Sequence, residues 1–352
     1  MDKILTIIIP TYNMERYLPK TLSSLVVDDA NLMHRLEVLV VNDGSKDESS
    51  NIAHKFQEKY PETFVVIDKE NGNYGSCINR GIKEATGTYV KVLDADDSFD
   101  NSLFPIYLHH LLKTDADLVM NDVTRVNEKD RLIRNTHFNL PTDDVFSLDL
   151  FSDEMIELFG MHNAAYKTES LRKMNYVQHE GISYTDQEWI FNPFTTINSV
   201  SYCRVLLYRY LLGREGQTMD AKVASRSANH HIAGAKKMLK DYENFKNLNP
   251  TQQHFVDFRM KLRCFNIYFA YLGSNILDLR ELIDFDDFVK SVSPRIYDRL
   301  EKSSISYMIP YKFIRVWHQN GRAVKPSRKY FQMAILSNKF RSVKWRLFPT
   351  IR

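Results

Sequence analysis

The stretch Tyr89-Val90-Lys91-Val92-Leu93-Asp94-Ala95-Asp96-Asp97 places an apolar run directly before three carboxylates. The run predicts a buried strand that ends near Asp94. Carboxylates this close together repel one another unless a cation or hydrogen-bond donors share the site, so a divalent metal that also binds phosphate oxygens is a natural partner. The plainer alternative is a polar turn in which Asp97 or Ser98 caps the next helix.

Strands and helices alternate around this stretch. Further buried strands are predicted by the apolar runs Ile4–Ile9, Leu36–Val41 and Phe64–Ile67, and one more strand is expected to end at Asn121-Asp122. Helices are expected over Glu15–Val27, from a capping box of Ser45 and Glu48 to about Tyr60, and after Gly75 to about Ala85. This alternation predicts an α/β fold with a doubly wound, mostly parallel sheet.

Four polar turns follow the first four predicted strands. They are Pro10-Thr11-Tyr12-Asn13, Asn42-Asp43-Gly44-Ser45, Asn71-Gly72-Asn73-Tyr74-Gly75 and Asp94-Ala95-Asp96-Asp97. In doubly wound sheets the carboxyl ends of the strands meet at one edge, where ligands bind. The four turns should therefore lie together, which favours a shared binding site over an isolated helix cap.

These turns, with Asn79, Gly81 and Ala85-Thr86-Gly87, resemble the family-2 glycosyltransferases of the GT-A fold in order and spacing over roughly residues 4–215. The resemblance implies an inverting hexosyltransferase that moves a sugar from a nucleotide diphosphate donor, usually a UDP-sugar, with Mg²⁺ or Mn²⁺ on an Asp-X-Asp motif. The acceptor it implies is a hydroxyl of a glycan, a lipid-linked saccharide or an anionic cell-surface polymer of the teichoic-acid type. One departure is Ile78, which stands where the family often has Arg before Asn79.

The donor contacts follow from this resemblance. Asp43 can accept a hydrogen bond from the imide N–H of uracil, although an Asx turn would also explain an Asp there. Pro10 and Thr11 can contact the base and ribose, whereas Asn13 is better suited to fixing its turn. Asn71 and Asn79 complete the expected nucleotide side of the site.

Asp96 is the expected direct metal ligand. Asp94 and Ala95 would lie near the ribose or a metal-bound water, with Asp97 in support. Lys91 is unusual inside a strand: either it extends its amine toward an edge of the sheet or it pairs with a carboxylate near the site, and the first is favoured.

Asp186 is the expected catalytic base, within Gly181-Ile182-Ser183-Tyr184-Thr185-Asp186-Gln187-Glu188-Trp189. Direct displacement at an anomeric carbon needs a base that takes the proton of the acceptor hydroxyl. Asp186 precedes a predicted helix over Gln187–Ile197, so a helix cap is the alternative role. Glu188 would point about 200° away from Asp186 on a helix, so the two cannot both face the sugar.

Three further residues are candidates for substrate contacts. His162 stands where the family often has an aromatic residue, and either a sugar contact or a structural role fits it. Arg214 and Gln217 lie in a glycine-flanked loop that could close over a diphosphate, and a plain surface loop is the alternative.

Composition places the chain in an ordinary class. With 43% hydrophobic and 26% charged residues it is globular rather than disordered. The cysteines Cys77, Cys203 and Cys264 are too few and too widely spaced for a disulfide framework or a zinc knuckle, which favours the cytoplasm. The N-terminus does not resemble a signal peptide, and no apolar run approaches the roughly 20 residues that span a bilayer.

Charge is distributed unevenly along the chain. Residues 302–352 hold 12 Lys or Arg and no Asp or Glu, so the rest holds 47 − 12 = 35 basic and 44 acidic side chains, a balance of −9. A stripe of Met333, Leu336, Phe340, Val343 and Leu347 runs along this tail at helical spacing. The stripe suits either a membrane surface or docking on the rest of the protein. The acidic body has no nucleic-acid motif, which argues against nucleic acid as a partner.

The expected organisation is a glycosyltransferase domain over residues 1–218, a helical appendage over 219–301 and a basic tail over 302–352. If the tail binds lipid, the protein would be peripheral at the inner face of the plasma membrane. A non-catalytic nucleotide-sugar binding subunit of a polysaccharide assembly complex is the alternative function. The presence of Asp94, Asp96 and Asp186 argues against it.

Overall fold

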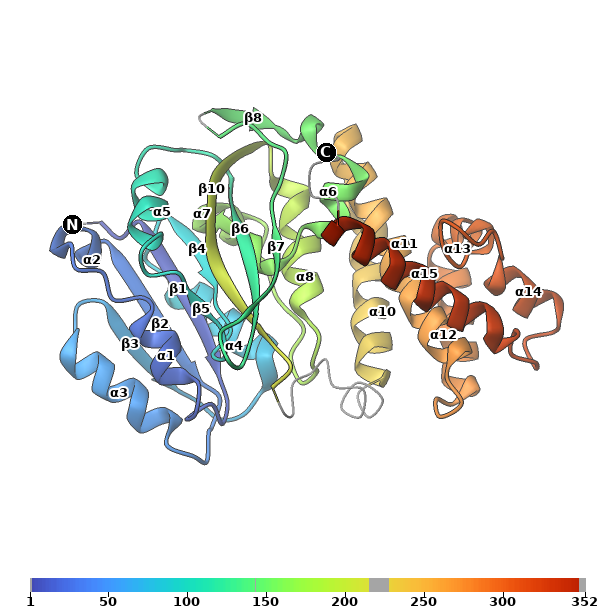
Figure 1. Ribbon diagram of the computed structural model, residues 1–352, viewed down its shortest axis with the longest axis horizontal. Helices are drawn as coiled ribbons and strands as arrows, with labels where there is room; N and C mark the ends of the chain where they lie inside the picture. The colour runs from blue at the N-terminus through green and yellow to red at the C-terminus, as the bar shows by residue number, and fades with distance from the viewer. Residues whose placement is uncertain (1, 143, 215–227, 348–352) are drawn as a thin grey trace. The chain divides into compact units, whose positions relative to one another are not determined.

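The computed structural model describes residues 2–142, 144–214 and 228–347, of which 338–347 are described by their backbone alone. This part of the chain forms two compact units (Figure 1). The described residues up to 214, together with 247–256, make an α/β unit. Those of 228–246 and from 257 onward make a helical unit.

The first four strands form the parallel half of one sheet, as predicted. They are β1 (Leu5–Thr11), β2 (Leu36–Asn42), β3 (Phe64–Asp68) and β4 (Tyr89–Val92), in the spatial order β3-β2-β1-β4. Ile8 pairs with Leu39 on one side and with Val92 on the other. Every residue of β2 is buried, as expected for a strand covered on both faces. The carboxyl ends of the four strands therefore lie at one edge.

The second half of the sheet is mixed, a refinement of the mostly parallel sheet expected. β9 (Ala164–Lys167) runs antiparallel between β4 and β6 (Leu118–Asn127), and β10 (Ser199–Leu212) runs parallel to β6. The short strands β5 (Ser98–Phe99), β7 (Leu132–Thr136) and β8 (Val145–Ser147) pair antiparallel with β10, β6 and β10 respectively. Ala164 and Ala165 in β9 have low strand propensity, so the sequence pattern gave no signal for this strand.

The prediction that a strand ends at Asn121-Asp122 is wrong, because β6 continues through both residues. Their side chains are buried but satisfied. Asn121 Oδ1 accepts a 2.7 Å hydrogen bond from Lys91 Nζ, and the carboxylate of Asp122 accepts one from the hydroxyl of Tyr202. In the sequence alone, polar residues that have hydrogen-bond partners in the interior give the same pattern as polar residues that end a strand.

Helices and short 3-10 turns accompany the sheet. They are α1 (Leu18–Ser23), α2 (Ala30–His34), α3 (Ser49–Lys59), α4 (Asn73–Glu84), α5 (Phe104–Leu111), η1 (Leu148–Leu150), α6 (Asp153–Leu158), η2 (Met161–Asn163), α7 (Thr168–Lys173), α8 (Asp186–Phe191) and η3 (Pro193–Thr196). α4 packs very closely on β1, because a Cβ on Gly81 would lie 2.6 Å from the side chain of Ile8. The predicted capping box is absent: α3 begins at Ser49, and Glu48 makes no side-chain cap.

The helical unit confirms the expected C-terminal appendage. Its helices are α10 (Ala228–Asn244), α11 (Pro250–Gly273), whose first residues belong to the α/β unit, α12 (Leu279–Val292), α13 (Pro294–Lys302), α14 (Phe313–Gln319) and α15 (Arg328–Leu347). Phe313 and Phe331, from the region expected to form a separate tail, pack edge to face with ring centroids 5.3 Å apart. Among the helices of the described ranges, none has the length and apolar character to cross a membrane.

Candidate functional site

The turn after β1 is tied to the turn after β2. Asn13 Oδ1 accepts a 2.8 Å hydrogen bond from the backbone N–H of Lys46, and the Asn13 N–H donates to Ser45 Oγ at 3.0 Å. The φ of Asn13 is 52°, in the left-handed region that Asn tolerates better than most residues. Asn13 thus holds the two turns together, and Ser45 serves this contact instead of capping α3.

Asp43 is buried at the end of β2 and is held by groups from the next turn. Its Oδ1 accepts hydrogen bonds from Lys69 Nζ at 2.6 Å and from the Gly72 N–H at 2.9 Å. The side-chain amide of Asn71 donates to the Asp43 backbone carbonyl at 2.9 Å. Lys69 was not among the site residues predicted from the sequence, although a basic residue directly after the third strand could have indicated this role. Asn71 shapes the loop that carries Asp43.

The three carboxylates of the acidic turn have different partners. Asp94 accepts a 2.8 Å hydrogen bond from the hydroxyl of Tyr74, and burial, reinforced by the charge of Asp96, raises the pKa of Asp94 to about 7. Asp97 is buried and accepts bonds from the Tyr208 hydroxyl and the Leu211 N–H, both at 2.7 Å. Burial and the neighbouring carboxylates raise the pKa of Asp97 well above its usual range. Asp97 therefore anchors the turn to β10.

Asp96 forms an ion pair with Arg214, which follows β10. The guanidinium of Arg214 also lies 5.5 Å from the ring centroid of Tyr17, within the range of a cation–π contact. Arg214 is thus attached to the acidic turn from a position 118 residues further along the chain. Gln217, the other candidate from that loop, lies outside the described residues.

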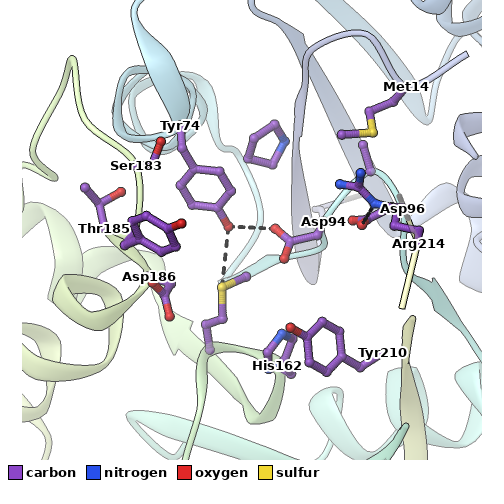
Figure 2. Close-up of a pocket in the computed structure, with 14 residues that line it drawn as sticks. Met14, Tyr74, Asp94, Asp96, His162, Ser183, Thr185, Asp186, Tyr210 and Arg214 are labelled. Carbon is purple, nitrogen blue, oxygen red and sulfur yellow. Dashed lines mark hydrogen bonds and ion pairs between the residues drawn. The ribbon is translucent and has the colours of Figure 1, made fainter. Parts of the chain in front are cut away.

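One pocket brings the acidic turn and Asp186 together (Figure 2). Of the residues singled out from the sequence, it is lined by Pro10, Asp94, Ala95, Asp96, His162, Asp186 and Arg214. In Figure 2, Asp94 and Asp96 lie on one side of the pocket, Asp186 lies on the other, and the Tyr74 ring stands between them. Lining residues that the sequence did not single out include Met14, Tyr74, Met161 and Tyr210.

The remaining nucleotide-side candidates do not line this pocket. Thr11 is buried, and its hydroxyl donates to the Ile9 carbonyl at 3.1 Å. Asn79 faces the chain that leads to Asp186: its amide nitrogen donates to the Gln178 carbonyl at 2.9 Å, and its oxygen accepts the Gln178 N–H at 2.8 Å. In this structure Asn79 positions a loop.

Asp186 is the first residue of α8, and its Oδ2 accepts a 2.9 Å hydrogen bond from the Gln187 side chain. Thr185 before it is buried, and its hydroxyl accepts a bond from Gln178 Nε2 at 2.9 Å. Glu188 is buried, and its Oε2 accepts the His179 N–H at 2.9 Å. The expectation that Asp186 and Glu188 point in different directions is confirmed, because only Asp186 of the two lines the pocket.

His162 packs against the aromatic side chains of β10. Its ring centroid lies 4.7 Å from that of Tyr208 and 4.5 Å from that of Tyr210. Burial, together with the nearby basic side chains of Arg125 and Lys91, lowers the pKa of His162 to about 3. A neutral imidazole therefore faces the pocket, available as a hydrogen-bond partner.

Lys91 lies beneath His162 and is fully buried. Its amine donates to Asn121 Oδ1 at 2.7 Å, to the His162 carbonyl at 3.0 Å and to the Ala164 carbonyl at 3.3 Å. Burial lowers the pKa of Lys91 well below its usual range. The favoured expectation, that Lys91 extends toward an edge of the sheet, is wrong: its amine is bound to oxygens in the interior and ties β4 to the η2 turn.

The site offers the oxygen ligands that Mg²⁺ and Mn²⁺ prefer. Ligand atoms of Asp94, Asp97 and His162 lie within 4.8 Å of one another. Within this group the Asp97 oxygens already accept bonds from β10, whereas Asp94 lines the pocket together with Asp96. Among the described residues, Asp96, the ligand expected from the sequence, is not part of this group and is paired with Arg214. The donor atoms whose spacing fits a divalent ion are those of Asp94, Asp97 and His162.

Comparison with known proteins agrees with this geometry. Residues 6–174 match the family model described as glycosyl transferase family 2. Residues 6–174 of the chain belong to this family. The chain is 31% identical over 196 residues to an uncharacterized glycosyltransferase of Mycoplasma genitalium, a match that covers 50% of this chain and 66% of that protein. It is 33% identical over 116 residues to the minor teichoic acid biosynthesis protein GgaB of Bacillus subtilis, covering 32% of this chain and 13% of GgaB.

The chain also shares its fold with a solved structure. TarS residues 1–349 from S. aureus, determined in complex with UDP-GlcNAc, superpose with a TM-score of 0.64 at 19% identity, covering 90% of this chain and 92% of that one. This likeness concerns the fold, which is the expected GT-A architecture. The chain spans less than two thirds of the length of the curated relatives named above.

Proposed function

We propose that this chain is an inverting glycosyltransferase that moves a sugar from a UDP-sugar to a hydroxyl of a cell-surface glycan, lipid-linked saccharide or anionic polymer. The observation that supports the proposal most directly is one pocket lined by the Asp94-Ala95-Asp96 turn on one side and by Asp186 on the other. Inverting displacement needs a leaving group and a base on opposite faces of the anomeric carbon. The pocket supplies carboxylates for both sides.

The nucleotide side would be built from the loops after β1, β2 and β3. The hydrogen bonds from Lys69 Nζ and from the Gly72 N–H to the Asp43 carboxylate both use Oδ1. We assign Oδ2 to the imide N–H of uracil, which requires an acceptor. Pro10 and Thr11 would contact the base and the ribose. The loop that carries Asn71 would enclose the nucleotide side of the site. The solved TarS complex with UDP-GlcNAc supports a UDP-sugar, since TarS shares this fold.

A divalent metal would be held on the pocket side of the acidic turn. We assign Asp96 as its direct ligand and Asp94 as a neighbour near the ribose. When bound, Mg²⁺ or Mn²⁺ would neutralise charge on the departing diphosphate. Arg214, already paired with Asp96, would contact the donor phosphates, and Gln217 would assist it.

Asp186 would act as the general base. The acceptor oxygen forms a bond to the anomeric carbon while the bond from that carbon to the diphosphate oxygen breaks. The hydroxyl proton passes to the Asp186 carboxylate, and the product has the opposite anomeric configuration. The match to a minor teichoic acid biosynthesis protein supports a cell-surface polymer as acceptor and hence a cytoplasmic site of action, where such polymers are assembled.

A donor screen tests this function. Purified protein would be incubated with a panel of nucleotide-sugars and Mg²⁺ or Mn²⁺, with release of nucleoside diphosphate as the readout. We expect turnover with a UDP-sugar, which Asp186→Asn should lower by about 10²- to 10⁴-fold while donor affinity persists. Glu169→Gln is the matched control, because Glu169 is exposed and pairs only with Lys173 among its described partners.

The screen separates the alternatives. If no nucleotide-sugar is turned over and Asp96→Ala leaves nucleotide affinity unchanged, the enzymatic proposal is wrong. If donor binds tightly but is never consumed with any acceptor, the chain is a binding subunit. Proton NMR of the product would report the anomeric configuration, and retention would contradict the inverting mechanism.

A further inference from the structure

The outward face of α15 exposes apolar side chains. Phe331 and Ala334 attach the helix to its unit: Phe331 packs 5.2 Å from the ring of Phe269, and Ala334 is fully buried. Met333 and Leu336, the first two members of the stripe noted in the sequence, are 42% and 53% exposed. The described part of the stripe therefore faces solvent and does not dock on the helical unit.

A second exposed apolar segment lies beside this face. The Ser306 and Ser337 hydroxyls are 3.4 Å apart, and the rings of Tyr311 and Tyr330 stack with centroids 3.9 Å apart. Residues 306–311 thus run alongside α15 in the opposite direction. Tyr330, Met333 and Ser337 share one side of the helix, because they follow the i, i+3, i+7 spacing.

The tip of this neighbouring segment carries Tyr307 and Met308, which are 99% and 72% exposed. They lie next to the side of α15 that presents Met333. We define the apolar patch as Tyr307, Met308, Met333 and Leu336. Exposed apolar side chains grouped in this way usually mark an interaction surface.

Positive charge lies on the same part of the chain as the patch. Lys312 directly follows residues 306–311, Arg328 and Lys329 begin α15, and all three are exposed. Residues 302–352 contain 12 Lys or Arg and no Asp or Glu, so no carboxylate side chain of this region offsets the charge. A partner with negative charge around an apolar interior would match both features.

We propose that the apolar patch and its basic surroundings bind the surface of an anionic lipid membrane. Tyr307 and the two methionines would enter the boundary between headgroups and acyl chains, while the lysines and arginines contact phosphate groups. A nucleic acid would satisfy the charges but not the exposed Met and Leu side chains. The patch residues do not line the pocket, so this inference does not depend on the proposed sugar transfer.

Vesicle cosedimentation of the full chain tests the proposal. The probes are vesicles of phosphatidylcholine alone and of phosphatidylcholine mixed with phosphatidylglycerol. We expect binding to the anionic vesicles only, weakened by added salt. Met333→Gln/Leu336→Gln and Tyr307→Ser/Met308→Ser should each lower vesicle affinity by roughly tenfold, because each removes two side chains that would enter the interface.

The matched control is Leu132→Ser/Val145→Ser, which removes two similarly exposed apolar side chains from β7 and β8 and should leave vesicle binding unchanged. Thermal melts would confirm that every variant is folded. Nucleotide-sugar turnover, measured in parallel without vesicles, should be unchanged in the patch variants, so the two proposals fail separately.

Three outcomes would overturn the membrane proposal. The first is wild-type protein that does not sediment with anionic vesicles. The second is binding that neither double variant weakens. The third is evidence for a different partner on the patch. Light scattering could show a dimer that Met333→Gln/Leu336→Gln dissociates without changing vesicle binding. Alternatively, the protein could bind DNA or RNA in a salt-sensitive way and not bind vesicles.

Discussion

The phenol of Tyr74 donates a 2.8 Å hydrogen bond to Asp94 inside the pocket that Asp186 also lines. The bond ties the start of α4 to the acidic turn after β4. Tyr74→Phe keeps the ring and removes the donor. Hydrogen bonds to charged groups contribute about 1.5–3 kcal/mol, so we expect kcat/KM for sugar transfer to fall by about 10- to 100-fold. Steady-state kinetics with the UDP-sugar identified in the screen would measure the fall.

Tyr202→Phe is the matched control for this variant. Tyr202 also donates to a buried carboxylate, that of Asp122, but neither residue lines the pocket. Tyr202→Phe should therefore lower the free energy of unfolding with little effect on kcat/KM. Equal losses of activity in the two variants would show that the Tyr74 bond serves only the general stability of the fold.

Lys69 fixes the carboxylate of Asp43 and should control nucleotide affinity. With Lys69→Met, Oδ1 of Asp43 keeps the Gly72 N–H but loses the charged donor at 2.6 Å. We expect the Kd for UDP, measured by calorimetry, to rise by about tenfold, consistent with the loss of one charge-assisted hydrogen bond. Lys173→Met, which removes an exposed lysine paired with Glu169, should leave the Kd unchanged. An unchanged Kd in Lys69→Met alongside a raised one in Asp43→Asn would contradict this role.

Lys91 should support the η2 turn that carries His162. Lys91→Met leaves up to three buried oxygens without their donor, so we expect the free energy of unfolding to fall by about 1–3 kcal/mol and turnover to fall with it. Urea titrations would measure the loss, and Lys113→Met at an exposed position is the control.

The pH dependence of the Lys91→Met effect has a definite sign. Because burial lowers the pKa of Lys91, the native chain binds fewer protons there than the unfolded chain at pH values between that lowered pKa and about 10.5. The stability of the wild type relative to Lys91→Met should therefore rise with pH over that range. A constant difference between the two proteins would mean that Lys91 stays charged in the native state.

His318 should make the helical unit less stable at alkaline pH. Its Nε2 lies 2.8 Å from Asp286 Oδ1, and its Nδ1 lies 2.7 Å from Glu301 Oε1. Arg322 forms an ion pair with the other oxygen of Asp286, and the Tyr297 ring stacks on the imidazole. Burial alone would lower the pKa of His318, but the two carboxylates outweigh it and raise that pKa above its usual range. The stabilisation is therefore complete below about pH 6.5 and is lost as pH rises through the raised pKa.

Thermal melts from acid to alkaline pH would test this prediction. His318→Gln should flatten the fall of Tm on the alkaline side, whereas His109→Gln, at an exposed position on α5, should keep the wild-type profile. Parallel profiles for the wild type and His318→Gln would contradict the assignment.

Sequence patterns located the parallel half of the sheet because a strand buried on both faces must be apolar along its length. The prediction of strands failed where a buried strand is not apolar along its length. β6 contains Asn121 and Asp122, whose polarity is balanced by Lys91, Tyr202 and His137 from elsewhere in the chain. β9 contains two alanines that carry no strand signal.

The sequence alone determined that four polar turns meet at one edge of the sheet, because parallel strands joined by helices all end on the same side. That fact, with the family pattern, indicated the acidic turn, Asp43 and Asp186. Tertiary structure alone decided the partners of these carboxylates: Lys69 for Asp43, Tyr74 for Asp94 and Arg214 for Asp96. Such contacts depend on how separate elements pack and on the rotamers that packing permits, and neither is encoded in the spacing of residues along one segment.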